Sequence, residues 1–224
     1  MGLSGTGAVT IWHDLLPEAK DAFYQWHNHE HMPERVGIPG FRRGRRYIAV
    51  QGAPEYFNLY EADSPEVLAG QDYLTRLNSP TPWTRELVVS FRNVARAICC
   101  VLYSAGVGQG GCMLTLRFDV ADAAAHTIAE LLCQHILPPL VDRSGIVGVH
   151  LCRADEQGSR IETAEKHLRN QNTLVPRWII LVEGISAAAV QAAEVALRKD
   201  MAIRGHPLQQ TNAATYVLES QRCK

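Results

Sequence analysis

The chain has 224 residues, 22 basic and 23 acidic side chains, and a formal net charge of −1 at pH 7. This balance argues against a general nucleic-acid binder, because such a protein needs a basic surface to neutralise phosphates. No segment approaches the ~20 consecutive apolar residues that span a bilayer, and the N-terminus lacks the basic and apolar regions of a signal peptide. The 6 cysteines form no CxxC pair and mostly lie in apolar runs, so we expect a reduced, cytoplasmic protein.

The predicted elements of the first half follow the order β-α-β-β-α-β. Ala8–His13 is a short apolar strand, and Pro17 suits the first position of a helix that runs to about His31 and stops at Pro33. The later elements of this half are strands at Phe41–Val50, Tyr56–Ala62 and about Asn93–Tyr103, with a helix that begins near Pro65.

The same order returns after residues 106–111, a glycine-rich linker. The second half is predicted to contain strands at Cys112–Phe118, Ile146–Arg153, Arg177–Glu183 and Thr215–Glu219, and helices at 122–137 and 187–199. The matching order indicates an internal duplication, with one ferredoxin-like repeat over residues 1–105 and a second over residues 112–224.

A single ferredoxin-like repeat has a four-stranded antiparallel sheet with helices on one face only, so its other face must be covered. Two repeats in one chain can cover those faces by packing them together. The predicted fold class is therefore α+β, with tandem βαββαβ repeats that form an intrachain barrel and helices outside it. Formation of a homodimer through the outer surfaces stays open.

The densest concentration of chemistry lies in residues 26–35, where three histidines and two carboxylates occur close together. Imidazole is the side chain most easily moved between charged and neutral forms near pH 7. On a helical wheel Glu30 falls on the apolar stripe, whereas His27 and His31 share one flank and His29 lies on the other. Burial would raise the pKa of the Glu30 carboxyl toward the range useful for acid–base catalysis. A structural Glu–Arg pair at the helix end is the equally weighted alternative.

The topology of such a repeat predicts the neighbours of this run. The first helix returns along the first strand, so its end should lie beside Tyr60 and the arginine-rich second strand. Either Arg42 or Arg46 could anchor a substrate carboxylate, although surface charge is the alternative for strand arginines. Trp83 either lines the pocket mouth or packs a loop, and His13 is expected about 20 Å away at the opposite end. The candidate substrate-binding residues are Trp26, Arg42, Arg46, Tyr60 and Trp83.

The second half does not repeat the cluster. When Pro138 is aligned with Pro33, Ile136 falls opposite His31, so we expect the first half to carry the chemistry. The polar run 162–169 lies before the third strand of the second half. It is a candidate lid or pocket wall, with a solvated helix or loop as the alternative.

These residues also resemble a known family. Phe23–Trp26 followed by His31–Pro33 resembles the EthD-like group of the dimeric α+β barrel superfamily, in which an aromatic–Trp pair precedes a His-x-Pro. Val36–Phe41 fits the same pattern, and the specific match covers Ala19–Tyr47. The resemblance implies a pocket between sheet and helices, with His31 as the family-type histidine. Members include cofactor-free monooxygenases, polyketide cyclases, dehydratases, isomerases and proteins without known activity.

Three functions are compatible with the predicted fold and candidate site. The leading hypothesis is an enzyme without an organic cofactor, an isomerase, dehydratase or other lyase that acts on a small carboxylated or phenolic metabolite. His31 and Glu30 would be acid and base and His27 an assistant, and the resemblance keeps cofactor-free monooxygenation open. The second is a metal enzyme in which His27, His29 and His31 bind Fe, Mn or Zn. The third is a non-catalytic small-molecule binding protein.

Overall fold

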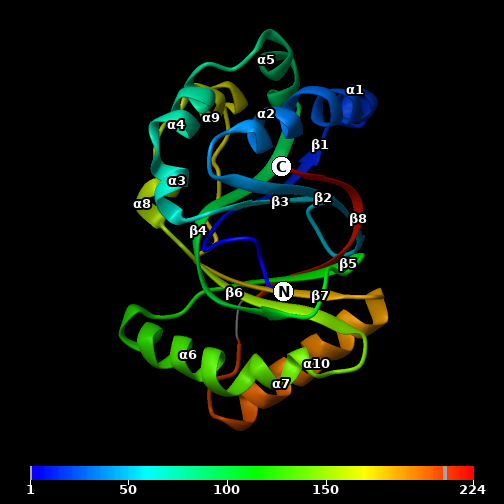
Figure 1. Cartoon of the computed structure of the whole chain (residues 1–224), viewed down its shortest axis with the longest axis vertical. Helices are drawn as coiled ribbons and strands as arrows, with labels where there is room; N and C mark the ends of the chain where they lie inside the picture. The colour runs from blue at the N-terminus through cyan, green and yellow to red at the C-terminus, as the bar shows by residue number, and fades with distance from the viewer. Residues whose placement is uncertain (1, 209–210) are drawn as a thin grey trace.

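The computed structural model describes residues 2–208 and 211–224, and its strands close into a barrel (Figure 1). The order around the barrel is β1-β3-β2-β8-β5-β7-β6-β4, and every neighbouring pair is antiparallel. The strands are β1 (Gly7–Leu15), β2 (Phe41–Gln51), β3 (Tyr56–Ala62), β4 (Phe91–Gly106), β5 (Cys112–Phe118), β6 (Ile146–Ala154), β7 (Trp178–Gly184) and β8 (Asn212–Cys223). The predicted fold class is confirmed, and the predicted strands differ from these mainly at their ends.

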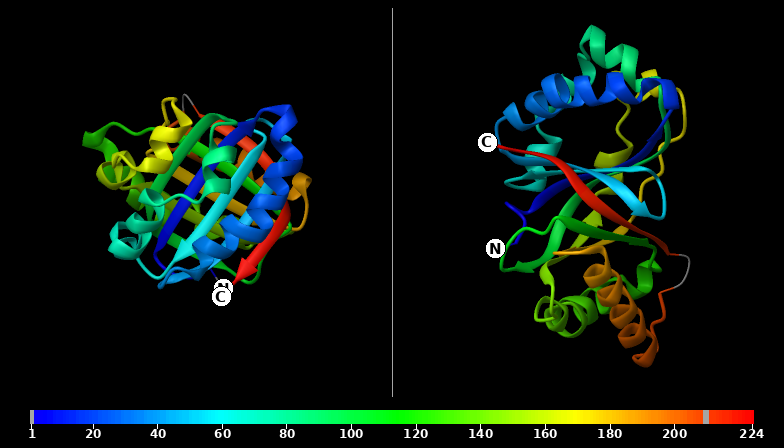
Figure 2. Two further views of the ribbon diagram at one scale, coloured as in Figure 1. Left: turned by 90° about the horizontal axis from the view of Figure 1, so that it is seen from above. Right: turned by 90° about the vertical axis from the view of Figure 1, so that its right-hand side faces the viewer.

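Two helical layers cover the barrel on opposite sides (Figures 1 and 2). One layer contains η1 (Pro17–Ala19), α1 (Lys20–Trp26), η2 (His27–His31), α2 (Met32–Gly37), α3 (Pro65–Ala69), α4 (Gln71–Asn78), α5 (Pro82–Val88) and, from the second half, α9 (Ala164–Arg169). The other contains η3 (Asp122–Ala124), α6 (Ala125–Leu131), η4 (Leu132–Ile136), α7 (Pro138–Val141) and α10 (Ala187–Ile203), and α8 (Glu156–Arg160) lies at the side. None of the described helices is long and apolar enough to cross a membrane.

The barrel consists of two four-stranded sheets joined along two seams. Strands β4-β1-β3-β2 form one sheet and β8-β5-β7-β6 the other, which is the strand order of a ferredoxin-like unit in each half. Pairing of β2 with β8 and of β4 with β6 closes the barrel. The two open sheet faces therefore cover each other, and side chains such as Trp12, Phe57, Leu181 and Tyr216 fill the interior.

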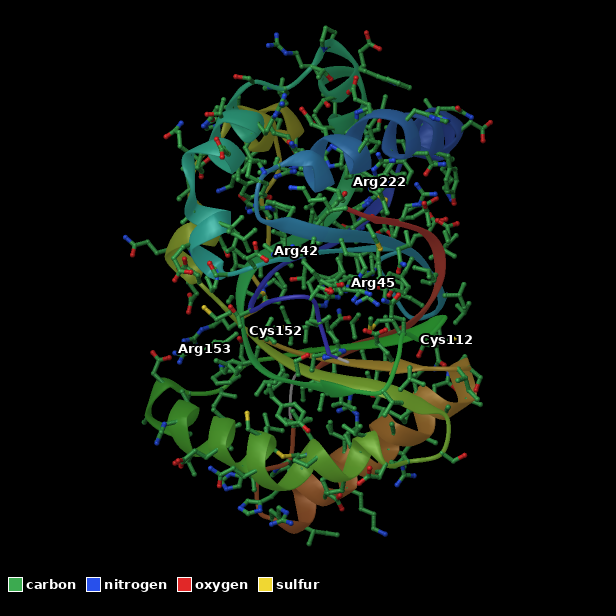
Figure 3. All side chains as sticks on the ribbon, viewed as in Figure 1. Arg42, Arg45, Cys112, Cys152, Arg153 and Arg222 are labelled. Carbon is green, nitrogen blue, oxygen red and sulfur yellow. The ribbon has the colours of Figure 1, made fainter. Side chains whose placement is uncertain are left out.

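Two of the arginines on β2 point into this interior rather than into a pocket under the helices. Arg43 pairs with Glu61 at 2.7 Å, and Arg45 pairs with Glu61 and Glu183 at 2.9 Å. Figure 3 shows Arg45 between the two sheets. Burial opposes ionisation of Glu183, but hydrogen bonds from His150 and Arg45 lower the pKa of this carboxyl to about 2. The charges of Arg43, Arg45, Glu61 and Glu183 are thus paired with each other.

The predicted helix stop at Pro33 is wrong. The helical region continues to Gly37, because η2 is a π-helical turn in which the backbone N–H of Met32 bonds to the carbonyl of His27, five residues back. Pro33 then falls in the first turn of α2, where a missing N–H is tolerated. The second half shows the same device, since η4 also precedes a proline and the N–H of Leu137 bonds to the carbonyl of Leu132 at 2.9 Å.

Candidate functional site

A small cavity of about 30 Å³ lies between the outer face of the first-half sheet and its helices. Its volume suits one or two water molecules or a small polar group. The aromatic side chains Phe23, Trp26 and Phe91 form part of its wall. Its polar wall consists of His13, His27, His31, Asn58, Tyr60, Glu165 and Arg169. We call it the histidine cavity.

His13 belongs to this cavity, so the expectation from the sequence that it lies about 20 Å away is wrong. Successive residues of a strand face opposite sides, so Trp12 points into the barrel and His13 points outward under the helices. The expectation failed because the helical region continues past Pro33, which places the histidines of η2 above the middle of the sheet. The ring of His13 lies 5.4 Å from that of Phe23, and its Nε2 lies 3.1 Å from Asn58 Nδ2.

His27 is held by two hydrogen bonds that define its tautomer. Its Nδ1 lies 3.1 Å from Nη1 of Arg46, and its Nε2 lies 3.2 Å from the hydroxyl of Tyr60. A guanidinium can only donate, so Nδ1 accepts and the neutral ring carries its proton on Nε2, which donates to Tyr60. The hydroxyl proton of Tyr60 is thereby left available to another acceptor. Arg46 also donates to Asn28 at 2.8 Å and to Glu219 at 3.0 Å, so its charge is already paired.

His31 combines tight packing with an unused nitrogen. Its ring centroid lies 4.2 Å from that of Trp26 and 5.6 Å from that of His27. Its Nδ1 is buried without a hydrogen-bond partner among the described residues, and the same holds for Oδ1 of Asn58 and Nε of Arg169. Buried polar atoms are nearly always hydrogen-bonded. Three such atoms on side chains of a single cavity therefore indicate a polar occupant.

The three histidines of the cavity are neutral at pH 7. Burial lowers the pKa of His13 to about 3. Burial also lowers the pKa of His27 well below its ordinary value, with smaller contributions from His31 and Arg46. For His31, burial and the positive charges of Arg35 and Arg169 lower the pKa in the same direction. A negative charge placed in the cavity would counteract the second of these causes.

The wall that closes the cavity comes from the second half of the chain. Helix α9 packs against α4 and α5, and Figure 1 shows it within the first helical layer. Glu165 on α9 accepts a hydrogen bond from Arg35, and Arg169 lies one turn later with its Nη1 3.6 Å from Glu165. The polar run 162–169, predicted as a lid or pocket wall, therefore supplies two lining side chains. The sequence did not single out Arg169 itself. The only signal for it was that it ends the polar run 162–169.

Glu30 does not line the cavity and is half-buried where the helix meets α5. Its Oε1 accepts hydrogen bonds from the indole N–H of Trp26 at 3.2 Å and from the hydroxyls of Thr81 and Thr84 at 2.5 and 3.3 Å. Among the residues that the structure describes, Glu30 does not form the Glu–Arg pair considered from the sequence. The arginines nearby pair with other acids, Arg35 with Glu34 and Glu165 and Arg76 with Glu34. Glu30 instead attaches the helix to α5 and fixes the indole against which His31 packs.

Three other predicted residues also lie away from the cavity. Arg42 is exposed and pairs with Asp63, because the β-bulge between Phe41 and Arg43 displaces it from the helix-facing side (Figure 3). Trp83 lies in α5 rather than in a loop and packs against the aromatic cluster under that helix. His29 is exposed, so it does not share a site with His27 and His31. Across residues 2–208 and 211–224, no group of three or more His, Cys, Asp or Glu side chains is arranged to hold a metal ion.

No family model and no curated protein matches the chain. Solved structures do: an anthrone oxidase-like protein (TM-score 0.63, 12% identity, covering 97% of this chain and 92% of the other) and a proposed monooxygenase from Fusobacterium nucleatum (TM-score 0.62, 9% identity, 99% and 96%). A proposed chlorite dismutase also matches (TM-score 0.56, 11% identity, 96% of each chain). The similarity establishes the ferredoxin-like, dimeric α+β barrel type of fold. At such identities it establishes nothing about the reaction.

Proposed function

We propose that this protein is an EthD-like enzyme that moves protons on a small carboxylated or phenolic compound, without an organic cofactor, and that the carboxylate or hydroxyl of this compound enters the histidine cavity. The observation that carries the proposal is the set of three buried, unpartnered polar atoms on His31, Asn58 and Arg169. An imidazole nitrogen, an amide oxygen and a guanidinium N–H together suit a ligand with both an acidic proton and a negative charge.

His31 is the proton-moving group in this proposal. Its neutral ring can accept a proton, and packing against the tilted ring of Trp26 restricts how the imidazole can turn. Trp26 is in turn held by Glu30 and Thr84, each 3.2 Å from its indole nitrogen. Glu30 is therefore a positioning residue that acts through Trp26, rather than the partner acid or base that the sequence suggested. His27 keeps a supporting role, because it fixes Tyr60 with its hydroxyl proton available.

Arg169 is the residue that would anchor a substrate carboxylate, in place of Arg42 or Arg46. Its acidic partner among the described residues is Glu165, 3.6 Å away, and Glu165 is shared with Arg35. The positive charge of Arg169 is therefore under-compensated. A bound anion would pair with Arg169 and compensate one of the positive charges that lower the pKa of His31. The base thus becomes stronger when the substrate is present.

A second candidate is oxidation of a phenolic compound by dioxygen without a cofactor. The aromatic side chains Phe23, Trp26 and Phe91 beside the cavity would contact a ring whose hydroxyl enters it, and proteins of similar fold include a proposed monooxygenase and an anthrone oxidase-like protein. Loss of the phenolic proton to His31 would give an electron-rich phenolate, with dioxygen as the oxidant. Consumption of dioxygen separates this reaction from an isomerase or lyase step.

The test is hydrogen–deuterium exchange into a panel of small carboxylated ketones and phenols in D2O, followed by proton NMR. We expect the wild type to accelerate exchange in at least one compound and His31→Ala to lower that rate by about 100-fold or more. His29→Ala removes an exposed histidine from the same turn and should leave the rate unchanged. Exchange by His31→Ala at the wild-type rate would remove this residue from the mechanism. Binding without exchange or turnover of any compound would favour the non-catalytic binding protein.

A further inference from the structure

An unpaired arginine lies inside the barrel, at the end opposite the network of Arg43, Arg45 and Glu61. Arg117 is an inward-facing residue near the end of β5 and is only 9% exposed. Its guanidinium lies 4.8 Å from the ring centroid of Trp12, and its Nη2 donates to the carbonyl of Ala53 at 3.4 Å. Its Nε has no hydrogen-bond partner, and no acidic side chain among the described residues pairs with it.

This arrangement differs from that of the other buried arginines of the barrel. Arg43 and Arg45 each form an ion pair with Glu61. A buried charge without a counter-ion costs free energy, and a cation–π contact offsets only part of that cost. Burial accordingly lowers the pKa of Arg117, against an opposing contribution from Tyr216. The buried charge of Arg117 therefore calls for an anion.

A cavity of about 250 Å³ opens beside Arg117, and we call it the barrel mouth. Its apolar wall is the stretch 174–176. Two backbone hydrogen bonds attach Leu174 to β4: the N–H of Arg96 donates to the carbonyl of Leu174 at 2.8 Å, and the N–H of Leu174 donates to the carbonyl of Val94 at 3.0 Å. Leu174 is 68% exposed at this rim. Asp119 contributes a single exposed carboxylate to the same wall.

We propose that the barrel mouth is a ligand site for a small organic monocarboxylate. The carboxylate would pair with the guanidinium of Arg117, and the apolar body would lie against residues 174–176. The negative charge of Asp119 would disfavour dianions. The site does not depend on the proposed function, because Trp12 lies inside the barrel whereas its neighbour His13 lies in the histidine cavity on the outer face of the sheet.

The experiment uses benzoate as the probe, measured by calorimetric titration of the full chain. We expect wild type to bind benzoate and Arg117→Met to bind it at least tenfold more weakly. Arg153→Met is the matched control, because Arg153 is exposed and its guanidinium lies 5.2 Å from the ring centroid of Trp178 (Figure 3). This control and His31→Ala should keep the wild-type affinity, while terephthalate, a dianion of the same ring, should bind more weakly than benzoate.

The proposal fails if benzoate does not bind the wild type, if Arg117→Met keeps the wild-type affinity, or if His31→Ala loses binding instead. Removing an unpaired buried charge should leave the melting temperature of Arg117→Met unchanged or higher. If that variant does not fold, Arg117→Lys carries the test, with a several-fold loss expected because the ammonium lacks the planar fork. In the wild type, benzoate should shift the indole N–H signal of Trp12 more than that of Trp178, and equal shifts would contradict the site.

Discussion

The two helical layers each contain a π-helical turn, but they bury different kinds of side chain at that turn. In the first layer the π-helical turn η2 buries His27 and His31 over a cavity of about 30 Å³. In the second layer the turn η4 buries Leu132 and Ile136 within a continuous apolar cluster. The comparison teaches that the turn and the proline after it recur in both halves, while the chemistry of the buried side chains does not. Dense apolar packing in one half leaves the other free to hold polar groups.

The first helical layer, which contains the histidines, also includes a helix from the second half of the chain. Helix α9 follows β6 in the chain, yet it packs against α4 and α5 and brings Arg169 to the histidine cavity. The second half therefore supplies both a rigid sheet and the outer wall of the candidate site. This division predicts that substitutions in the two layers affect stability and activity differently.

The largest expected effect on stability comes from substitutions at positions 132 and 27, which are equivalent in the two π-helical turns. Leu132→Ala removes a fully buried side chain from the apolar cluster and should lower the free energy of unfolding by ~2–5 kcal/mol. His27→Leu keeps the site filled but leaves Tyr60 without its imidazole partner, so we expect a loss of only ~1–2 kcal/mol. Urea denaturation at pH 7 measures both. Equal losses in the free energy of unfolding would show that His27 in the first helical layer contributes as much to stability as Leu132 in the second.

The next effect is a loss of stability on acidification that originates in the histidine cavity. The folded pKa of His13 is about 3, below the unfolded value of 6.5, so the unfolded chain binds the extra proton. Stability is therefore unaffected above pH 6.5 and falls as the pH is lowered toward 3, by ~2 kcal/mol between pH 6.5 and 5 for this histidine alone. His13→Phe should remove that part of the pH dependence. His126→Ala changes an exposed histidine of the second layer and should not, and equal slopes in the two variants would contradict the assignment.

Much of the fold could be predicted from the sequence because strand and helix patterns repeat in the two halves. The apolar run Ala8–His13 and the position of Pro17 indicated the first strand and the first helix. Closure of the barrel followed from the need to cover two open sheet faces. Whether the halves arose by duplication, with boundaries at 105 and 112, stays a prediction.

The candidate site could be predicted only in part. His27, His31, Trp26, Tyr60 and Arg46 lie at or beside the cavity, because helix periodicity and strand alternation determine which way they point. Three features depended on long-range geometry that local patterns do not contain. They are the π-helical turn that continues the helix past the proline, the resulting inclusion of His13, and the docking of α9 from the other half.

The smallest expected effect tests how the polar layer is attached. The hydroxyl of buried Thr84 lies 3.2 Å from the indole nitrogen of Trp26 and 3.3 Å from Glu30, whereas the position equivalent to Glu30 in the second layer is the exposed His135. Thr84→Val keeps the shape of the side chain and should cost ~1 kcal/mol in the free energy of unfolding, because the indole retains Glu30 as an acceptor. Thr75→Val, on an exposed face of α4, should cost within ~0.5 kcal/mol of zero. If thermal unfolding shows the two variants to be equal, hydroxyl bonds do not hold α5 to the histidine layer, and the apolar contacts of Leu87 and Val88 do.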